Sequence, residues 1–146
     1  VVKTMTDLER IGDEAAKIAR MAKLIHKAER ISLPRFTEVK YMSELVLDML
    51  RKALDGFARL DATKAVDIAR ADQQVDEEFR LNLRHLITYM MEDPRTISVF
   101  IDILFVTKAI ERMGDHAKNM SEYVVYMVKG KDVRHTSLEE IEKEVL

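Results

Sequence analysis

Apolar side chains recur at helical spacing along nearly the whole chain. Successive apolar positions are separated by alternating steps of three and four residues, which is the period of an amphipathic α-helix. Glycine and proline interrupt helices, and the chain has only 4 and 2 of them, respectively. We therefore predict an all-α fold with four long helices, over residues 1–31, 37–58, 63–91 and 94–128.

Two of the predicted helices have a regular apolar seam, the set of positions that faces neighbouring helices. Steps of three and four favour left-handed, antiparallel packing like that of a coiled coil. In the first helix the expected seam consists of Leu8, Ile11, Ala15, Ile18, Ala22 and Ile25. In the last helix it consists of Val99, Ile103, Val106, Ile110, Met113, Ala117, Met120, Val124 and Met127.

Residues typical of helix ends lie between these stretches. Pro34 ends the first helix, and Asp93 directly before a proline is typical of the N-cap of the last one. Gly130 suits the position just after that helix. In the charged tail that follows, Ser137 and Glu140 have the spacing of a capping box, so a short helix is expected from Ser137.

A short motif occurs twice, near the two ends of the chain. The sequence LERIGDEA at 8–15 recurs as IERMGDHA at 110–117, and the apolar seams of the two helices coincide when the motifs are aligned. Such a repeat defines the architectural unit. We therefore predict that residues 1–33 are the last helix of a first three-helix repeat and that residues 34–146 are a second three-helix bundle with a charged tail. The first helix is expected to pack on this bundle or on another copy of the chain.

Each copy of the motif carries two carboxylates with a glycine between them. Glu9 and Asp13 are four residues apart, as are Glu111 and Asp115, so each pair shares one helix face. Two such carboxylates repel each other unless an arginine, a lysine or an oxygen-preferring metal ion lies between them. A mid-helix glycine costs about 1 kcal/mol relative to alanine. We expect it to let a neighbouring helix or an ion approach closely.

A third acidic pair, Asp72 and Asp76, lies on the third predicted helix. Asp72 falls in the apolar stripe of that helix, where an unpaired carboxylate is costly. Because the third and fourth helices are expected to run antiparallel, this pair is expected at the same height as Glu111 and Asp115, so that four carboxylates converge. The alternative is a metal-free network of salt bridges with partners among Arg10, Arg80, Lys108 and Arg112.

Composition excludes several classes of function. Lys and Arg number 24 against 26 Asp and Glu, and the net charge of -2 argues against a dedicated nucleic-acid-binding protein. The absence of cysteine excludes disulfides, thiol catalysis and cysteine-ligated zinc or iron–sulfur sites. No apolar run approaches the ~20 residues of a membrane span. The chain begins with Val1 inside a helical pattern, so we expect it to be part of a longer protein.

The repeated motif resembles the signature of the PhoU family of bacterial phosphate-signalling proteins. The shared pattern is Glu-Arg-x-Gly-Asp at 9–13 and 111–115, and Asn119 and Glu122 extend the second copy. The pair at 72–76 is similar to the family's other acidic motif. The resemblance covers essentially the whole chain but only part of a family member. It implies two three-helix bundles in tandem, the first of which contributes only its last helix here.

The resemblance also implies a function. Family members are negative regulators of phosphate uptake and of the phosphate-starvation response, in the cytoplasm or peripherally at the inner membrane, and are not enzymes. The implied partners are the ATPase of the phosphate ABC transporter and a sensor histidine kinase, with a homodimer also expected. Multinuclear clusters of iron, or else of manganese or magnesium, are implied on two sets of ligands. These are Asp72, Asp76, Glu111 and Asp115, and a set involving Glu9 and Asp13.

The first copy of the motif departs from the second. Lys17 stands where the second copy has Asn119, and the acidic pair that would complete the first set would belong to the missing helices. The second set therefore matches the family better. His116 follows Asp115, but neighbouring residues of a helix point in different directions, so we do not expect His116 to be a ligand.

Two other functions remain open from the residues alone. One is a metal-free helical interaction or structural module. The other is a carboxylate-bridged metalloenzyme, but the carboxylates of the last helix are expected to be too exposed for the dry, open site that it needs. A basic stripe on the first helix is expected to be a solvated face, or else a surface that docks on an acidic partner or on a membrane. Its members are Lys17, Arg20, Lys23, Lys27 and Arg30.

Overall fold

The computed structural model of the chain describes residues 1–27 and 37–146, and the regular structure in these two ranges is helical. The helices are α1 (Val2–Lys27), α2 (Thr37–Arg59), α3 (Lys64–Glu92), α4 (Ile97–Lys129) and α5 (Leu138–Val145), with a 3₁₀ turn, η1 (Pro94–Thr96), before α4. The predicted all-α fold is confirmed. The predicted break at Pro34, the boundary between the two predicted repeats and Arg30 of the basic stripe lie outside the described residues. None of the described helices combines the length and apolar character that a membrane span requires.

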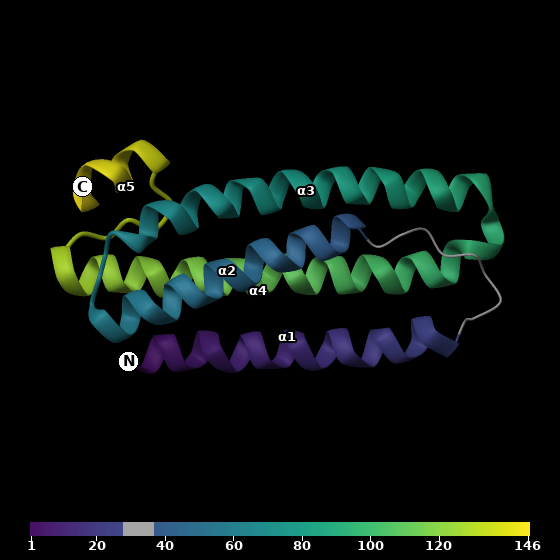
Figure 1. The fold of residues 1–146 in the computed structure, drawn as a ribbon, viewed down its shortest axis with the longest axis horizontal. Coiled ribbons are helices and arrows are strands. Elements are labelled where there is room, and N and C mark those ends of the chain that lie inside the picture. The colour runs from purple at the N-terminus through teal and green to yellow at the C-terminus, as the bar shows by residue number, and fades with distance from the viewer. Residues whose placement is uncertain (28–36) are drawn as a thin grey trace.

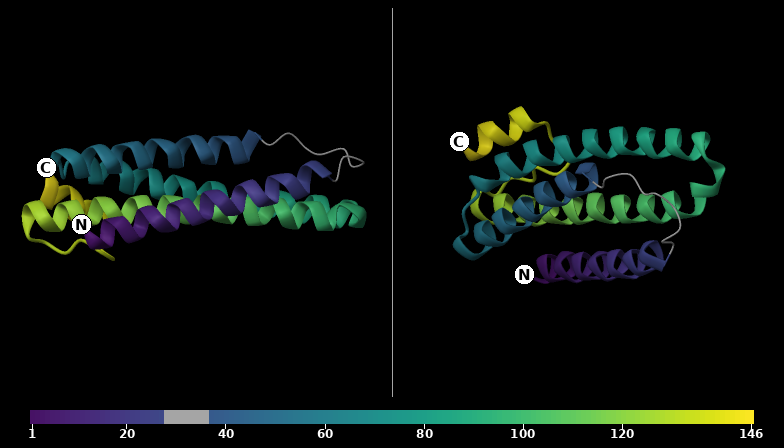
Figure 2. Two further views of the ribbon diagram at one scale, coloured as in Figure 1. Left: turned by 90° about the horizontal axis from the view of Figure 1, so that it is seen from below. Right: turned by 45° about the vertical axis from the view of Figure 1, so that its right-hand side comes forward.

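Helix α4 occupies the centre of the molecule. It packs against α1, α2 and α3, and α2 also packs against α3, so α2, α3 and α4 form a three-helix bundle. Figure 1 shows α1 and α3 on opposite sides of α4, and Figure 2 shows α2 beside the α3–α4 pair. Among the described residues, α1 contacts α4 alone, which is the first of the two arrangements expected for that helix.

The core of the bundle consists of apolar side chains from all three of its helices. Burying one such side chain contributes roughly 1.5–3 kcal/mol to folding. The fully buried members include Met42, Met49, Ile68, Val75 and Met120. A second cluster lies where α5 covers α3, and Ile141 and Val145 are its contributions from α5.

The end of α4 and the start of α5 follow the predicted signals. Gly130 ends α4 in the left-handed conformation, with a φ of 69°, and its N–H donates to the carbonyl oxygen of Tyr126. Ser137 and Glu140 form the predicted capping box. The hydroxyl of Ser137 accepts from the N–H of Glu140, and the carboxylate of Glu140 accepts from the N–H of Ser137.

The last long helix begins later than the predicted residue 94. Within η1, the N–H of Arg95 donates to Oδ1 of Asp93 at 3.1 Å, so the side chain of Asp93 caps this turn as an N-cap residue does. Regular α-helical structure starts at Ile97. At the other end Met127 is 44% exposed, so the apolar seam of α4 ends earlier than predicted.

Helix α1 faces α4 with only part of the predicted seam. Ile11 of that seam is buried, and Ile18 and Ile25 are half-buried against the core clusters. Thr4, Asp7 and Ile11 are buried, so polar side chains form part of the contact. A buried polar group requires a partner, and α4 supplies partners for α1 with His116 and Arg112. The helix is therefore rotated toward its polar positions. The members of the predicted seam left exposed are Leu8, Ala15 and Ala22.

The two repeated glycines have different surroundings. A Cβ atom on Gly114 would lie 3.3 Å from Cγ2 of Val46 and 3.7 Å from Cε of Met49, both on α2. The absence of a side chain at Gly114 therefore lets α2 approach α4 closely. Close approach of a neighbouring helix was one of the two roles expected for this glycine, and close approach of an ion was the other. A Cβ atom on Gly12 would have no atom of the described residues within 4 Å.

Candidate metal centre

The acidic pairs of α3 and α4 meet on the surface between these two helices. Asp72 and Asp76 lie in the first half of α3, and Glu111 and Asp115 lie on either side of the middle of α4. One oxygen from each of Asp72, Asp76 and Asp115 lies within 4.8 Å of the others. Glu111 lies near them, and its charge raises the pKa of all three aspartates. The three aspartates therefore converge, with Glu111 near them, in the antiparallel arrangement of α3 and α4 that the sequence predicted.

A buried hydrogen bond fixes the register of α3 against α4. The side-chain amide of Asn82 donates to the hydroxyl of Thr107 at 3.0 Å, and that hydroxyl donates to the carbonyl of Ile103 at 2.9 Å. Farther from the carboxylates, the rings of Tyr89 and Phe100 stack with their centroids 5.6 Å apart. Because these contacts pair the two helices in antiparallel order, they hold the acidic pairs at the same height.

Burial makes these carboxylates costly to ionise. Asp72 is 7% exposed, and burial raises its pKa against the opposing effect of Lys118. The pKa of Asp115 is raised to about 7, first by burial and then by the charges of Glu111, Asp72 and Asp76. Burial also raises the pKa of Asp76, and the charge of Asp72 raises it further. The buried Oδ1 atom of Asp72 has no hydrogen-bond partner among the described residues.

Two lysines of α4 partly neutralise the cluster. Nζ of Lys108 lies 2.8 Å from Oε2 of Glu111, so Lys108 is one of the predicted salt-bridge partners that does pair with the cluster. Nζ of Lys118 lies 3.6 Å from Oδ2 of Asp72 and 3.9 Å from Oε1 of Glu122. The contact of Lys118 with Asp72 was not predicted from the sequence. The position of Lys118 four residues before Glu122 on the acidic face was the available signal.

The carboxylates of α4 are less exposed than predicted. The side chain of Glu111 is only 12% exposed, because α3 packs beside this face of α4. The other predicted salt-bridge partners contribute less. Arg112 lies 3.7 Å from Glu14 of α1 instead of neutralising the cluster, and Arg80 acts on Asp76 only as a nearby charge.

The acidic pair of α1 lies apart from this cluster. Glu9 and Asp13 are both exposed. Within the described ranges, no third carboxylate or histidine joins them in a group tight enough to hold a metal ion. Their assignment to a second metal set stays a prediction.

A partly buried hydrogen bond joins α1 to α4 at the residue that follows Asp115. Nδ1 of His116 lies 2.9 Å from Oδ1 of Asp7, and the two side chains are 16% and 10% exposed. His116 therefore points toward α1, although it follows Asp115 in the sequence. This contact was not predictable from the sequence, since nothing in the pattern around Asp7 indicates its partner before the two helices are placed together.

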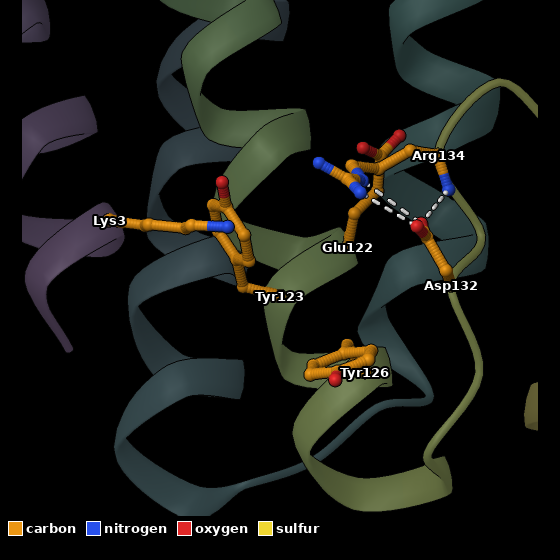
Figure 3. A pocket seen from close by; sticks show the side chains of 6 residues that line it. All are labelled: Lys3, Glu122, Tyr123, Tyr126, Asp132 and Arg134. Atoms are coloured by element: carbon orange, nitrogen blue, oxygen red, sulfur yellow. Dashed lines mark hydrogen bonds and ion pairs between the residues drawn. The ribbon is translucent and has the colours of Figure 1, made fainter.

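One cavity adjoins the carboxylate cluster, and a second shares Glu122 and Arg134 with it. The first has a volume of about 230 Å³ and is lined by Asp72, Asp115, Lys118, Asn119, Glu122, Arg134 and His135. The second, of about 210 Å³, is lined by Lys3, Glu122, Tyr123, Tyr126, Asp132 and Arg134. Figure 3 shows Arg134 next to Glu122 and hydrogen-bonded to Asp132, while Lys3 reaches from α1 toward the ring of Tyr123. Glu122 and Arg134 line both cavities and so separate them.

The donor set fits a hard metal ion. The three converging aspartates and the nearby Glu111 offer carboxylate oxygens, which suit magnesium, manganese and iron better than the soft metals that prefer sulfur. Oδ1 of Asp72 is buried and has no hydrogen-bond partner among the described residues, which is costly for a carboxylate oxygen. A bound metal ion would compensate this oxygen in place of a hydrogen bond. The raised pKa of Asp115 likewise marks a surplus of negative charge that a cation would relieve.

Comparison with known proteins identifies the family. A family model described as the PhoU domain matches residues 39–124, which is more than half of the chain. The chain belongs to the PhoU family. The matched region runs through α2, α3 and α4 and contains the three converging aspartates and Glu111.

Individual PhoU proteins match over nearly the whole chain. The phosphate-specific transport system accessory protein PhoU homolog of Pseudomonas putida is 48% identical over 146 residues, covering 99% of this chain and 56% of that protein. The phosphate-specific transport system accessory protein PhoU of Escherichia coli (strain K12) is 42% identical over 143 residues, covering 98% of this chain and 58% of that protein. These relatives are named as accessory proteins of phosphate-specific transport.

The fold matches an experimentally determined PhoU structure. The crystal structure of PhoU from Pseudomonas aeruginosa aligns with a TM-score of 0.84 at 46% sequence identity, covering 88% of this chain and 61% of that chain. This chain therefore spans between 56% and 61% of the length of these PhoU proteins.

Proposed function

We propose that this chain belongs to a cytoplasmic, metal-binding regulator that restrains phosphate uptake and the phosphate-starvation response. The observation that carries the proposal is the convergence of Asp72, Asp76 and Asp115, whose oxygens lie within 4.8 Å of one another. The naming of PhoU relatives as accessory proteins of phosphate-specific transport supports the regulatory role.

The proposed metal ligands are the converging Asp72, Asp76 and Asp115 together with the nearby Glu111. A bound iron, manganese or magnesium ion would supply the positive charge that compensates their mutual repulsion. Two ligands come from α3 and two from α4, so the ligands themselves link the two helices. The metal would thus stabilise the surface that these helices present to partners.

The partners proposed for the whole protein are the ATPase of the phosphate ABC transporter, a sensor histidine kinase and a second copy of the protein. The names of the relatives support the association with phosphate transport. A pull-down with the full-length protein tests this part of the proposal. If the full-length protein retains neither the ATPase nor the kinase, the regulatory role is contradicted.

The metal centre is tested by measuring the metal content of protein purified without chelator. The parent is compared with a variant carrying Glu111→Ala and Asp115→Ala, and with the control Asp102→Asn, which changes a partly exposed aspartate of α4 outside the cluster. We expect stoichiometric iron or manganese in the parent and in the control. The double variant should lose the metal and keep its helical circular dichroism.

A metal-free helical module is the second candidate. It is favoured by the two lysines that already pair with the cluster, Lys108 with Glu111 and Lys118 with Asp72. In that case, neither parent nor variant would contain metal after loading with excess iron or manganese. Removal of divalent cations by a chelator would then leave the thermal stability unchanged.

A further inference from the structure

Lys118 contacts the most deeply buried carboxylate of the proposed metal centre. Its Nζ lies 3.6 Å from Oδ2 of Asp72, and Asp72 is 7% exposed. The other oxygen of Asp72, Oδ1, is buried without a hydrogen-bond partner among the described residues. The two oxygens of this carboxylate therefore differ, since one is near an ammonium group and the other is free to accept.

We propose that Lys118 competes with the metal ion for Asp72 and thereby lowers the affinity of the centre. The inference rests on the metal centre proposed above and concerns a residue outside its ligand set. An ammonium group beside Asp72 cancels part of the negative charge that attracts a cation, and it repels a divalent ion at short range. Metal binding must therefore move the ammonium group away.

Glu122 provides the position to which Lys118 moves. Its Oε1 already lies 3.9 Å from Nζ of Lys118, one helical turn beyond it on α4. The side chain of Lys118 is 32% exposed and lines the cavity of about 230 Å³, so its end has room to move. Glu122 itself is 8% exposed and keeps a positive partner if Lys118 turns from Asp72 toward it. Metal entry therefore leaves neither Lys118 nor Glu122 unpaired.

Lys108, the other lysine at the cluster, is placed differently. It pairs with Glu111 at 2.8 Å and lies over the ring of Phe79, with its Nζ 5.2 Å from the ring centroid. These two contacts hold it beside a single carboxylate at the edge of the cluster. Lys118 lies between two carboxylates, which is the arrangement that a displaceable cation requires.

The test measures the affinity for Mn²⁺ alone by isothermal titration calorimetry on protein stripped of metal. Lys118→Gln removes the charge and retains a polar side chain, and Lys118→Arg retains the charge. Lys129→Gln, at the exposed end of α4, is the matched control. We expect Lys118→Gln to bind Mn²⁺ roughly tenfold or more tightly than the parent. Lys118→Arg and Lys129→Gln should stay close to the parent.

A double-mutant cycle separates displacement from the simple loss of a charge. Glu122→Gln removes the alternative partner of Lys118, so it should weaken Mn²⁺ binding in the parent. In the Lys118→Gln background the same change should weaken binding several-fold less, because no lysine is left to be displaced. Circular dichroism and thermal melts verify that each variant folds, and Lys118→Met replaces Lys118→Gln if the latter does not fold.

The outcomes are distinguishable. If parent and control bind Mn²⁺ and the charge-removing variant binds it equally or more weakly, the competition is overturned and the metal centre stands. An equal effect of Glu122→Gln in both backgrounds would overturn the displacement toward Glu122. If no form of the protein binds Mn²⁺ at millimolar concentration, the metal centre and the inference fail together.

Discussion

The imidazole of His116 and the carboxylate of Asp7 form a hydrogen-bonded pair, with 2.9 Å between Nδ1 and Oδ1, at the contact between α1 and α4. Because an ionised carboxylate only accepts hydrogen bonds, Nδ1 of His116 is the donor. Both side chains are mostly buried, and among the described residues α4 is the only helix that α1 contacts. This pair is therefore a principal polar anchor of α1.

Replacing His116 should loosen the docking of α1. In His116→Ala the buried carboxylate of Asp7 loses its partner, and we expect the free energy of unfolding to fall by about 1–3 kcal/mol. Urea denaturation followed by circular dichroism measures this loss. The control Arg20→Ala changes an exposed residue of α1 and should stay within about 0.5 kcal/mol of the parent. A loss no larger in His116→Ala than in the control would show that the pair does not anchor α1.

The two repeated glycines should respond differently to alanine. Alanine favours a helix over glycine by about 1 kcal/mol. At Gly12 a Cβ atom would have no atom of the described residues within 4 Å, so Gly12→Ala should stabilise the chain by up to that amount. At Gly114 the Cβ atom would lie 3.3 Å from Val46, a buried residue, so this gain should be reduced or lost. Thermal melts of the two variants compare the effects, and a larger gain at Gly114 would contradict this packing.

The raised pKa of Asp115 predicts a pH dependence of stability in the metal-free protein. Its pKa is about 7 in the folded chain against 3.8 without structure, so the folded state binds the proton more tightly. The contribution of Asp115 to the free energy of unfolding is therefore present in full below pH 3.8, where the carboxyl group is protonated in both states. It is lost as the pH rises toward about 7, because the folded chain must then hold the ionised carboxylate. Asp115→Asn removes the charge, so it should be more stable than the parent at pH 8, by at least about 1.4 kcal/mol.

Urea denaturation in the presence of a chelator, at several pH values between 5 and 8, tests this dependence. The advantage of Asp115→Asn over the parent should grow as the pH rises through this range. Asp102→Asn, on the same helix but outside the cluster, should show no such growth. An advantage that does not change with pH would mean that Asp115 titrates in its ordinary range.

Helix α5 should depend on one buried side chain. Ile141 is 3% exposed in the cluster that α5 shares with α3 and α4, and Ile141→Ala should lower the free energy of unfolding by about 2–4 kcal/mol. Hydrogen exchange should show faster opening of α5. The control is Leu146→Ala, at a residue that is 82% exposed, and it should have little effect. Unchanged exchange in α5 of the Ile141 variant would contradict its docking.

Much of the fold was predictable from the sequence because local rules decide it. Helical periodicity located the long helices, and the chemistry of Gly130, Ser137 and Glu140 located the end of α4 and the start of α5. The seam of α1 was not predictable in the same way. It includes Asp7, whose burial becomes favourable only when His116 of another helix is beside it.

The sequence by itself determined the helical class, the repeated motif and the acidic pairs, because each depends on residues that are neighbours along one helix. The convergence of Asp72, Asp76 and Asp115 could be anticipated from antiparallel packing. Only the tertiary structure decided how deeply these carboxylates are buried and that Lys118 lies against Asp72. Burial and ion pairing depend on distances between α3 and α4, and such distances are set by the packing of whole helices.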